Sequence, residues 1–125
     1  MIAFPKAFTK LGEIKVDDVK DGMAGLLLEG EKVVAAFKRP YEDDTVAFTD
    51  KRVIVSVAGG VVALKKDITS LPYSKIQGFS VETTGSLDTD AEMVLVFLSL
   101  GEVKFGFKGP ADVAMLTRMI GAFVL

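Results

Sequence analysis

Hydrophobic and polar positions alternate with a helical period near both ends of the chain and with a period of two between them. Near the N-terminus, the sequence VDDVKDGMAGLLLEG (16–30) places apolar residues three and four positions apart, as on one face of a helix. Asp17 suits the N-cap of this helix and Gly30 suits a C-terminal stop. The pattern predicts a short N-terminal helix whose apolar face contains Val19, Met23, Leu26 and Leu27.

The middle of the chain is rich in β-branched and aromatic residues that alternate with polar ones. The two glycines Gly59 and Gly60 permit the positive φ angles of a two-residue hairpin turn, and Pro72 ends a ladder because it lacks an N–H group. The pattern therefore predicts five successive strands, within EKVVAAFKR (31–39), DTVAFTD (44–50), RVIVSVA (52–58), VVALKKDITSLPY (61–73) and KIQGFSVETT (75–84).

The sequence of the last third of the chain predicts an antiparallel pair of strands followed by a helix. GSLDTD (85–90) is typical of a turn, AEMVLVFLSL (91–100) is a strand, and Gly101–Glu102 fits a tight hairpin before VKFGFK (103–108). Pro110 then suits the first position of a C-terminal helix. The apolar stripe of this helix comprises Met115, Leu116, Met119, Ile120, Phe123 and Val124.

Short antiparallel strands followed by one apolar-faced helix predict a bent antiparallel sheet or partly open barrel of about seven strands, capped by that helix. The motifs LLLEGEKVVAAFK, VAFTDKRVIV, LPYSKIQGFSVETTG, LDTDAEMVLVF and VKFGFKG, in this order and spacing, resemble the bacterial pleckstrin-homology-like (PH-like) domain family, first known as a domain of unknown function. The resemblance covers residues 17–125 as a single PH-like domain and leaves residues 1–16 as an N-terminal extension.

Composition excludes several common chemistries. The 125 residues include no Cys and no His, which removes thiolate nucleophiles, Ser-His-Asp triads and the usual zinc ligands. A formal net charge of −2 lacks the basic character of most nucleic-acid-binding proteins. We therefore expect no enzyme activity, no cofactor, no metal and no nucleic-acid partner. Without a recognisable signal peptide or apolar span, we expect a cytoplasmic protein.

Four basic residues are the candidate ligand-binding residues: Lys38, Arg39, Lys51 and Arg52. Together they could hold a phosphate group, whereas the alternative is a solvated turn at Thr49, Asp50 and Lys51, with Asp50 bonding nearby backbone N–H groups and Arg52 beginning the next strand. The alternative is favoured. In PH domains that bind phosphoinositides, the stretch corresponding to FKRPYEDDTV carries basic residues, but here Glu42, Asp43 and Asp44 oppose an anionic headgroup. Membrane lipid is therefore not an expected partner.

Three further motifs are interpreted as structural. Asp88, Asp90 and Glu92 lack the remaining ligands of a calcium loop. Ser74 and Lys75 could form a catalytic dyad only with a desolvated lysine and an oxyanion hole, so PYSKI is interpreted as a bend. Gly59–Gly60 lacks the lysine of a phosphate-binding loop.

We therefore expect a non-enzymatic interaction module. The resemblance implies a scaffold that assembles with itself, as a ring, and presents a polar surface to another protein; the alternative is a small-ligand or lipid-binding domain that uses the open end of the barrel. Both faces of the strand at 91–100 are apolar, so one face must be covered by a terminal helix or by a second subunit. The candidate interface residues are Val94, Val96, Leu98 and Leu100, opposite Met93, Leu95 and Phe97.

Overall fold

The computed structural model describes residues 7–23, 25–40, 43–59, 65–83, 91–109 and 111–125. Within these ranges the chain forms eight strands, two α-helices and one 3-10 turn. In chain order they are β1 (Ala7–Ile14), α1 (Val16–Met23), β2 (Val33–Lys38), β3 (Thr45–Thr49), β4 (Arg52–Gly59), β5 (Lys65–Pro72), η1 (Tyr73–Lys75), β6 (Ile76–Thr83), β7 (Ala91–Phe97), β8 (Gly101–Phe107) and α2 (Val113–Val124).

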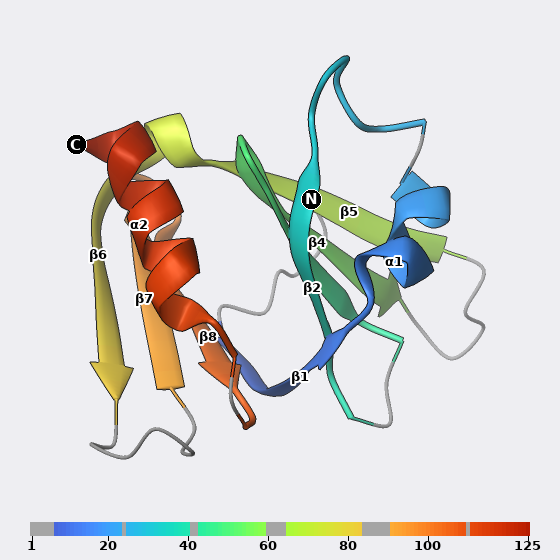
Figure 1. Ribbon diagram of the computed structural model, residues 1–125, viewed down its shortest axis with the longest axis horizontal. Coiled ribbons are helices and arrows are strands. Elements are labelled where there is room, and N and C mark those ends of the chain that lie inside the picture. Colours follow the sequence, from blue (N-terminus) through green and yellow to red (C-terminus); the bar gives the residue numbers. More distant parts are fainter. Residues whose placement is uncertain (1–6, 24, 41–42, 60–64, 84–90, 110) are drawn as a thin grey trace.

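The strands form one sheet in the order β5-β4-β3-β2-β1-β8-β7-β6. Neighbouring strands are antiparallel except β1 and β8, which are parallel. The sheet curls into a half-barrel, with β6, β7 and β8 on one side and β2 to β5 on the other (Figure 1). The predicted fold class, a bent sheet with a C-terminal helix and a short N-terminal helix, is confirmed.

Strand β1 corrects the predicted domain boundary, because it lies in the middle of the sheet and not in an extension before residue 17. Its two fully buried residues, Phe8 and Leu11, are three positions apart. Between them the register shifts and Lys10 adopts a positive φ of 57°. This bulge interrupts the period of two, which is why the apolar pattern does not reveal the strand.

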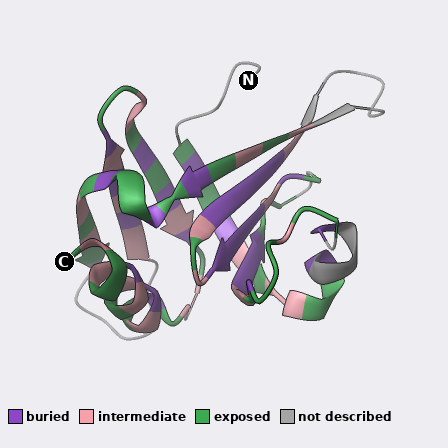
Figure 2. Cartoon of the chain, turned by 90° about the horizontal axis from the view of Figure 1, so that it is seen from above, coloured by how far each residue is buried: buried purple, intermediate pink, exposed green. Residues whose placement is uncertain are grey.

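The main core lies inside the curled sheet and is filled mainly by phenylalanine rings. Phe37 and Phe107 lie 4.8 Å apart between ring centroids, and Phe105 contacts both Phe8 and Phe48 at 5.7 Å. Helix α2 closes this core with three buried side chains, and Figure 2 shows buried and exposed positions alternating along the strands. These helix residues are Val113, Leu116 and Ile120.

Helix α1 covers the opposite face of β2, β3 and β4. Val19 and Met23 of this helix pack with Ala36, Ala47 and Ile54 in a second cluster. The central part of β4 is therefore buried on both faces, since its odd-numbered valines belong to the main core. The N-terminal helix thus covers β2 to β4 and not the second face of β7.

Both helices begin and end at other residues than predicted. Helix α1 begins at Val16, so Asp17 lies in its first turn and is not the N-cap, and the helix ends at Met23, before Leu26 and Leu27. Helix α2 begins at Val113, where the Asp112 side chain accepts the Met115 N–H at 3.0 Å as the N-cap. Pro110 lies outside the described residues.

Two predicted turns also differ from those in the structure or lie partly outside the described residues. Phe97 pairs with Gly101, so the β7–β8 turn is formed by residues 98–100 and the predicted hairpin at Gly101–Glu102 is wrong. Gly101 begins β8 with a φ of +88°, a conformation that glycine adopts readily. Gly59 is the last residue of β4 and pairs with Lys65, while Gly60 and the predicted turn at 85–90 lie outside the described residues.

Candidate functional site

The four candidate basic residues do not form one cluster. Lys38 pairs with Thr45 at one end of the β2–β3 ladder, whereas Val33 pairs with Thr49 at the other end, next to Lys51 and Arg52. Five residue steps along β2, about 17 Å at the usual rise of a strand, separate the two pairs. The four residues therefore lie too far apart to hold one phosphate group together, which was the less favoured of the two interpretations.

At the β2–β3 end, acidic side chains neutralise the basic ones. Arg39 Nη1 donates to Asp44 Oδ2 at 3.0 Å, and the Asp44 carboxylate is buried. Lys38 Nζ lies 3.9 Å from Asp43 Oδ1 in an exposed pair. An incoming phosphate would have to displace the carboxylates of Asp43 and Asp44 from these basic side chains.

At the opposite end, Arg52 belongs to a buried hydrogen-bond network that sequence reasoning missed. Arg52 Nη2 donates to Glu31 Oε1 at 2.9 Å and Arg52 Nε donates to Glu31 Oε2 at 3.0 Å. Arg52 Nη1 donates to Ser70 Oγ at 2.8 Å, and Nη2 also donates to the Leu26 carbonyl at 2.7 Å. This two-point pairing of a guanidinium with a carboxylate is among the strongest hydrogen-bonded arrangements in proteins. Nothing in the sequence marks Glu31 as the partner of an arginine 21 residues later.

Thr49 joins this network to the β3–β4 turn. Its hydroxyl donates to Glu31 Oε2 at 2.7 Å and accepts the N–H groups of Lys51 and Arg52 at 3.0 Å. The predicted turn is confirmed at Asp50 and Lys51, and Arg52 begins β4 as predicted. Thr49, however, supplies the turn hydrogen bonds that were expected from Asp50, and the Arg52 side chain is only 18% exposed. The Asp50 carboxylate instead accepts the Lys32 N–H at 3.1 Å.

Two groups around this turn have shifted pKa values. Burial alone would raise the pKa of Glu31, but hydrogen bonds from Arg52, the Leu28 N–H and Thr49 outweigh burial and lower it from 4.5 to about 2. Burial raises the pKa of Tyr73 well above its usual value, and the charges of Asp50 and Glu31 act in the same direction. Glu31 is therefore ionised and Tyr73 neutral at physiological pH.

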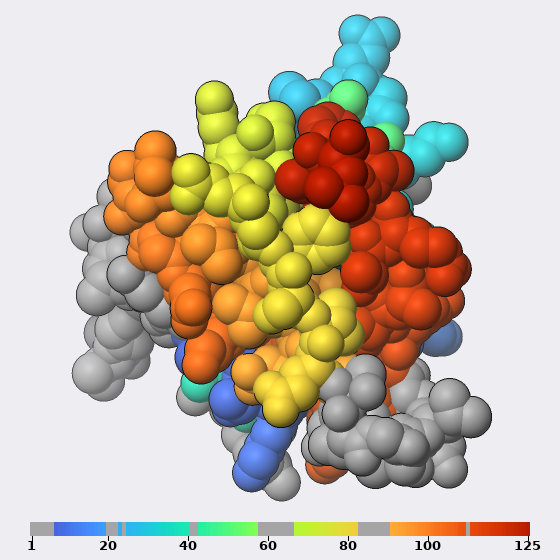
Figure 3. Space-filling view, turned by 90° about the vertical axis from the view of Figure 1, so that its left-hand side faces the viewer, coloured from blue at the N-terminus to red at the C-terminus, as the bar shows by residue number. Residues whose placement is uncertain are grey.

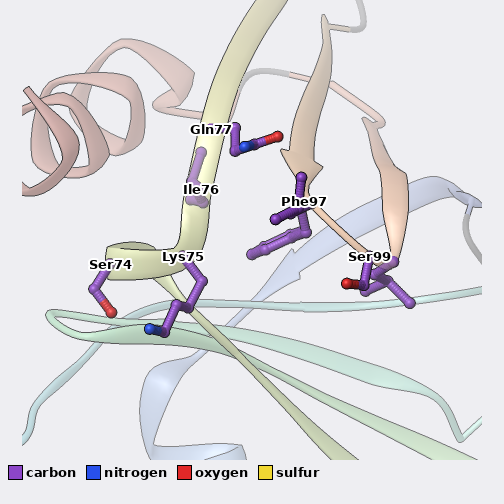
Figure 4. A pocket seen from close by; sticks show the side chains of 8 residues that line it. Ser74, Lys75, Ile76, Gln77, Phe97 and Ser99 are labelled. Atoms are coloured by element: carbon purple, nitrogen blue, oxygen red, sulfur yellow. The ribbon is translucent and has the colours of Figure 1, made fainter.

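The 3-10 turn η1 borders a surface pocket of about 520 Å³ (Figure 4). Its base is formed by Ile76 and Phe97, which are cross-strand partners, and its rim by Leu98 and Leu100 of the β7–β8 turn. Lys75 is the one charged residue that lines the pocket in the described part of the chain. The pocket can thus accommodate an apolar group that carries a negative charge.

PYSKI is a bend, as predicted: Pro72 ends β5, η1 follows, and β6 begins at Ile76. Ser74 and Lys75 are both exposed, so Lys75 is not in the desolvated setting that a Ser-Lys dyad requires. Asp88 and Asp90 lie outside the described residues. Within the described ranges, no group of three acidic, His or Cys residues is placed to hold a metal ion.

The four candidate interface residues occupy two neighbouring places. Val94 and Val96 are half-buried on the outer face of β7. Their cross-strand partners on β8 are Lys104 and Glu102, respectively. Leu98 and Leu100 belong to the turn after β7 and line the pocket, so they do not continue the face of the strand as predicted. On the opposite face of the same strand, Met93, Leu95 and Phe97 are buried in the core, which confirms the predicted alternation along β7.

Edge strand β6 lies on the surface between α2 and β7 (Figure 3).

No helix in the described ranges is long and apolar enough to cross a membrane.

Comparison with known proteins adds the following. A family model described as the bacterial PH domain matches residues 3–124. The uncharacterized protein YjqA of Bacillus subtilis (strain 168) is 47% identical over 75 residues, which cover 60% of this chain and 58% of YjqA. The matched part is thus less than two thirds of the length of that relative.

Two solved structures are similar over nearly the whole chain. A DUF1696 family protein with a pleckstrin-homology domain from Shewanella loihica PV-4 has a TM-score of 0.75 and 28% identity, with 94% of this chain and 100% of that chain covered. The pleckstrin homology domain from Shewanella amazonensis SB2B has a TM-score of 0.63 and 29% identity, with 91% of each chain covered.

Proposed function

Because the chain belongs to the bacterial PH domain family, with residues 3–124 matched, we propose that it is a non-enzymatic PH-like scaffold that assembles with itself into a closed ring. A polar outer surface of this ring would bind a partner protein. A cytoplasmic location remains part of this proposal, and fractionation of cells that produce the protein tests it.

The observation that supports self-assembly is the apolar surface along β7 and the turn after it. Val94 and Val96 face outward, and Leu98 in the adjoining turn is 78% exposed. Helix α1 packs on β2 to β4 and α2 packs on the main core, so neither helix covers this surface in the described ranges. Contiguous exposed apolar surface is typical of sites where proteins associate.

The proposal that the protein is not an enzyme is supported by the side chains that fill the interior of the curled sheet. The curled sheet encloses aromatic side chains where a barrel with a ligand cavity would be hollow. Glu31 and Tyr73, whose pKa values are shifted, are both engaged in hydrogen bonds that anchor the β3–β4 turn. Their shifts are explained by structural roles.

Two substitutions on adjacent positions of β7 test self-assembly. Leu95→Lys places a charge in the core, where we expect unfolding, whereas Val96→Lys places it on the outer face beside Glu102, where the fold tolerates it. We expect the Val96→Lys variant to keep its circular dichroism spectrum and to have a smaller mass by light scattering after size exclusion. Ile68→Lys, which also replaces an exposed apolar residue, is the control and should keep the wild-type mass. A wild-type protein that is monomeric at high micromolar concentration would contradict the proposal.

The pocket beside η1 favours one alternative, the binding of a small apolar anion or lipid. Its volume of about 520 Å³ is within the roughly 300–1,000 Å³ typical of ligand pockets, and Lys75 supplies a positive charge. Thermal-shift measurements with octanoate, and co-sedimentation with anionic liposomes, test this alternative. Saturable stabilisation that Lys75→Gln abolishes would support it.

A further inference from the structure

The connection between α1 and β2 projects from the body of the domain. Figures 1 and 3 both show it rising above the sheet, in cyan. Its side chains Leu26 and Leu28 are 45% and 58% exposed, and Glu29 is exposed beside them. We refer to residues 25–30 as the projecting segment. About half of each leucine side chain thus stays in contact with water in a monomer, and burying it would be favourable.

The backbone of the projecting segment is nevertheless held firmly. The Leu26 carbonyl accepts a hydrogen bond from Arg52 Nη2 at 2.7 Å, and the Leu28 N–H donates to Glu31 Oε1 at 2.9 Å. Gly30 completes the return to β2 with a φ of +80°, which glycine adopts without strain. The ion pair of Glu31 and Arg52 thus fixes the direction in which the two leucines point. Buried ion pairs often contribute more to a defined conformation than to net stability.

The pocket beside η1 has the complementary chemistry. Leu98 and Leu100 offer apolar surface beside the buried side chains of Ile76 and Phe97. The remaining lining residues are polar, and Lys75 is the one that carries a charge. The projecting segment offers leucine side chains followed by the carboxylate of Glu29. Apolar surface would therefore meet apolar surface, and a negative charge would meet a positive one.

The projecting segment and the pocket are also fixed relative to each other. Tyr73, which precedes Ser74 of the pocket, donates its N–H to the Lys51 carbonyl at 3.1 Å and its hydroxyl to the Thr49 carbonyl at 2.7 Å. Thr49 and Arg52 in turn hold Glu31. One hydrogen-bonded framework therefore supports both surfaces, so each contact between copies would have the same orientation.

We propose that the projecting segment of one copy occupies the pocket of a second copy, with Leu28 against Ile76 and Leu98 and with Glu29 facing Lys75. This inference rests on the proposed self-assembly and names a contact that would act together with the apolar face of β7, with Leu98 belonging to both. The contact is head-to-tail because the two surfaces are different. Its repetition closes a ring when the rotation from one copy to the next is a whole-number fraction of 360°.

Two charge reversals test the contact, with mass measured by light scattering after size exclusion. Glu29→Lys and Lys75→Glu each place like charges together, and we expect each to raise the dissociation constant about tenfold or more. In a mixture, each contact between one variant and the other restores opposite charges, so we expect the mixture to assemble where neither variant alone does. The doubly substituted chain should recover the wild-type mass. Both residues are exposed, so the fold is not at risk.

The apolar part of the contact is tested by Leu28→Ala, matched with Ile68→Ala on β5. We expect only Leu28→Ala to weaken assembly, because Ile68 belongs neither to the projecting segment nor to the lining of the pocket. If the wild type assembles and neither the charge reversals nor Leu28→Ala changes its mass, this inference is overturned while the proposed self-assembly stands. A monomeric wild type overturns both. Saturable binding of octanoate to the assembled protein through Lys75 would show an empty pocket and also overturn the inference.

Discussion

Glu31 and Arg52, 21 residues apart in the sequence, join the start of β2 to the start of β4 through two parallel hydrogen bonds of 2.9 and 3.0 Å. The Glu31 carboxylate is fully buried and the Arg52 side chain is 18% exposed. Every oxygen of the carboxylate has a further donor, the Leu28 N–H or the Thr49 hydroxyl. The hydrogen bonds within the protein therefore replace those that both charged groups make with water in the unfolded chain.

Removing the charge of Glu31 should destabilise the domain. Glu31→Gln keeps the shape of the side chain but leaves the Arg52 charge without its partner, for which we expect a loss of about 3 kcal/mol in the free energy of unfolding. Urea denaturation measures this loss. Lys38→Gln, which breaks the exposed pair with Asp43, is the control and should change stability by less than about 1 kcal/mol. Equal effects of the two variants would contradict the structural role of Glu31.

Stability should fall in acid because of the same residue. The pKa of Glu31 is about 2 in the folded protein and 4.5 when unperturbed, so the unfolded state binds more protons between these values. The stabilisation is complete above about pH 5 and is lost as the pH falls toward 2. At about 1.4 kcal/mol per pKa unit, we expect a total loss of about 3 kcal/mol. Denaturation of Glu31→Gln across this range should show a flatter pH dependence than the wild type.

Tyr73→Phe tests the hydrogen bond that fixes η1 to the β3–β4 turn. The substitution removes the hydroxyl that donates to the Thr49 carbonyl at 2.7 Å but keeps the ring and its contact with Phe123. We expect a loss of about 1–2 kcal/mol, since a buried acceptor is left without its partner. The raised pKa of Tyr73 means that the wild type loses stability as the pH rises above about 10, where the unfolded tyrosine ionises. Thermal denaturation at pH 8 and pH 11 should show a smaller difference for Tyr73→Phe.

Lys10→Gly should stabilise the domain. Lys10 holds a φ of 57° at the β1 bulge, a conformation that costs a residue with a Cβ about 1–2 kcal/mol. Glycine avoids this cost but loses more backbone freedom on folding, so we expect a net gain of about 0.5–1 kcal/mol. Thr9→Gly, which has no such strain to relieve, should be destabilising. A loss of equal size in both variants would argue against strain at Lys10.

The fold was predictable wherever one apolar face follows a regular period. Val103, Phe105 and Phe107 alternate with exposed residues in β8, and Leu116 and Ile120 lie on the predicted face of α2. Strand β1 was not predictable because its bulge separates Phe8 and Leu11 by three positions. The turns were misplaced because a single glycine, such as Gly101, suits either a turn or the first residue of a strand.

The candidate site was predictable only in part, because it depends on contacts between distant segments. The basic residues near 38 and 51 are close in sequence, yet β2 and β3 carry them to opposite ends of the β2–β3 ladder. Glu31 looks like any polar residue before a strand, and only the curled sheet brings it against Arg52. The sequence separated the two faces of β7, but both are apolar, so only the fold shows which one is exposed. The pocket needs the β7–β8 turn to lie beside η1.

The position of β1 constrains when the domain can complete its fold during synthesis. β1 is made first, yet one of its two sheet neighbours, β8, lies near the other end of the chain. The ribosome therefore releases β2 to β5 long before the parallel neighbour of β1 exists, so the early chain can form only the five strands from β1 to β5. Because pairing over such a separation in sequence slows folding, the last step should be the joining of the two halves along β1 and β8. Until then, the nascent chain exposes the edge of β1 to chaperones and to neighbouring chains.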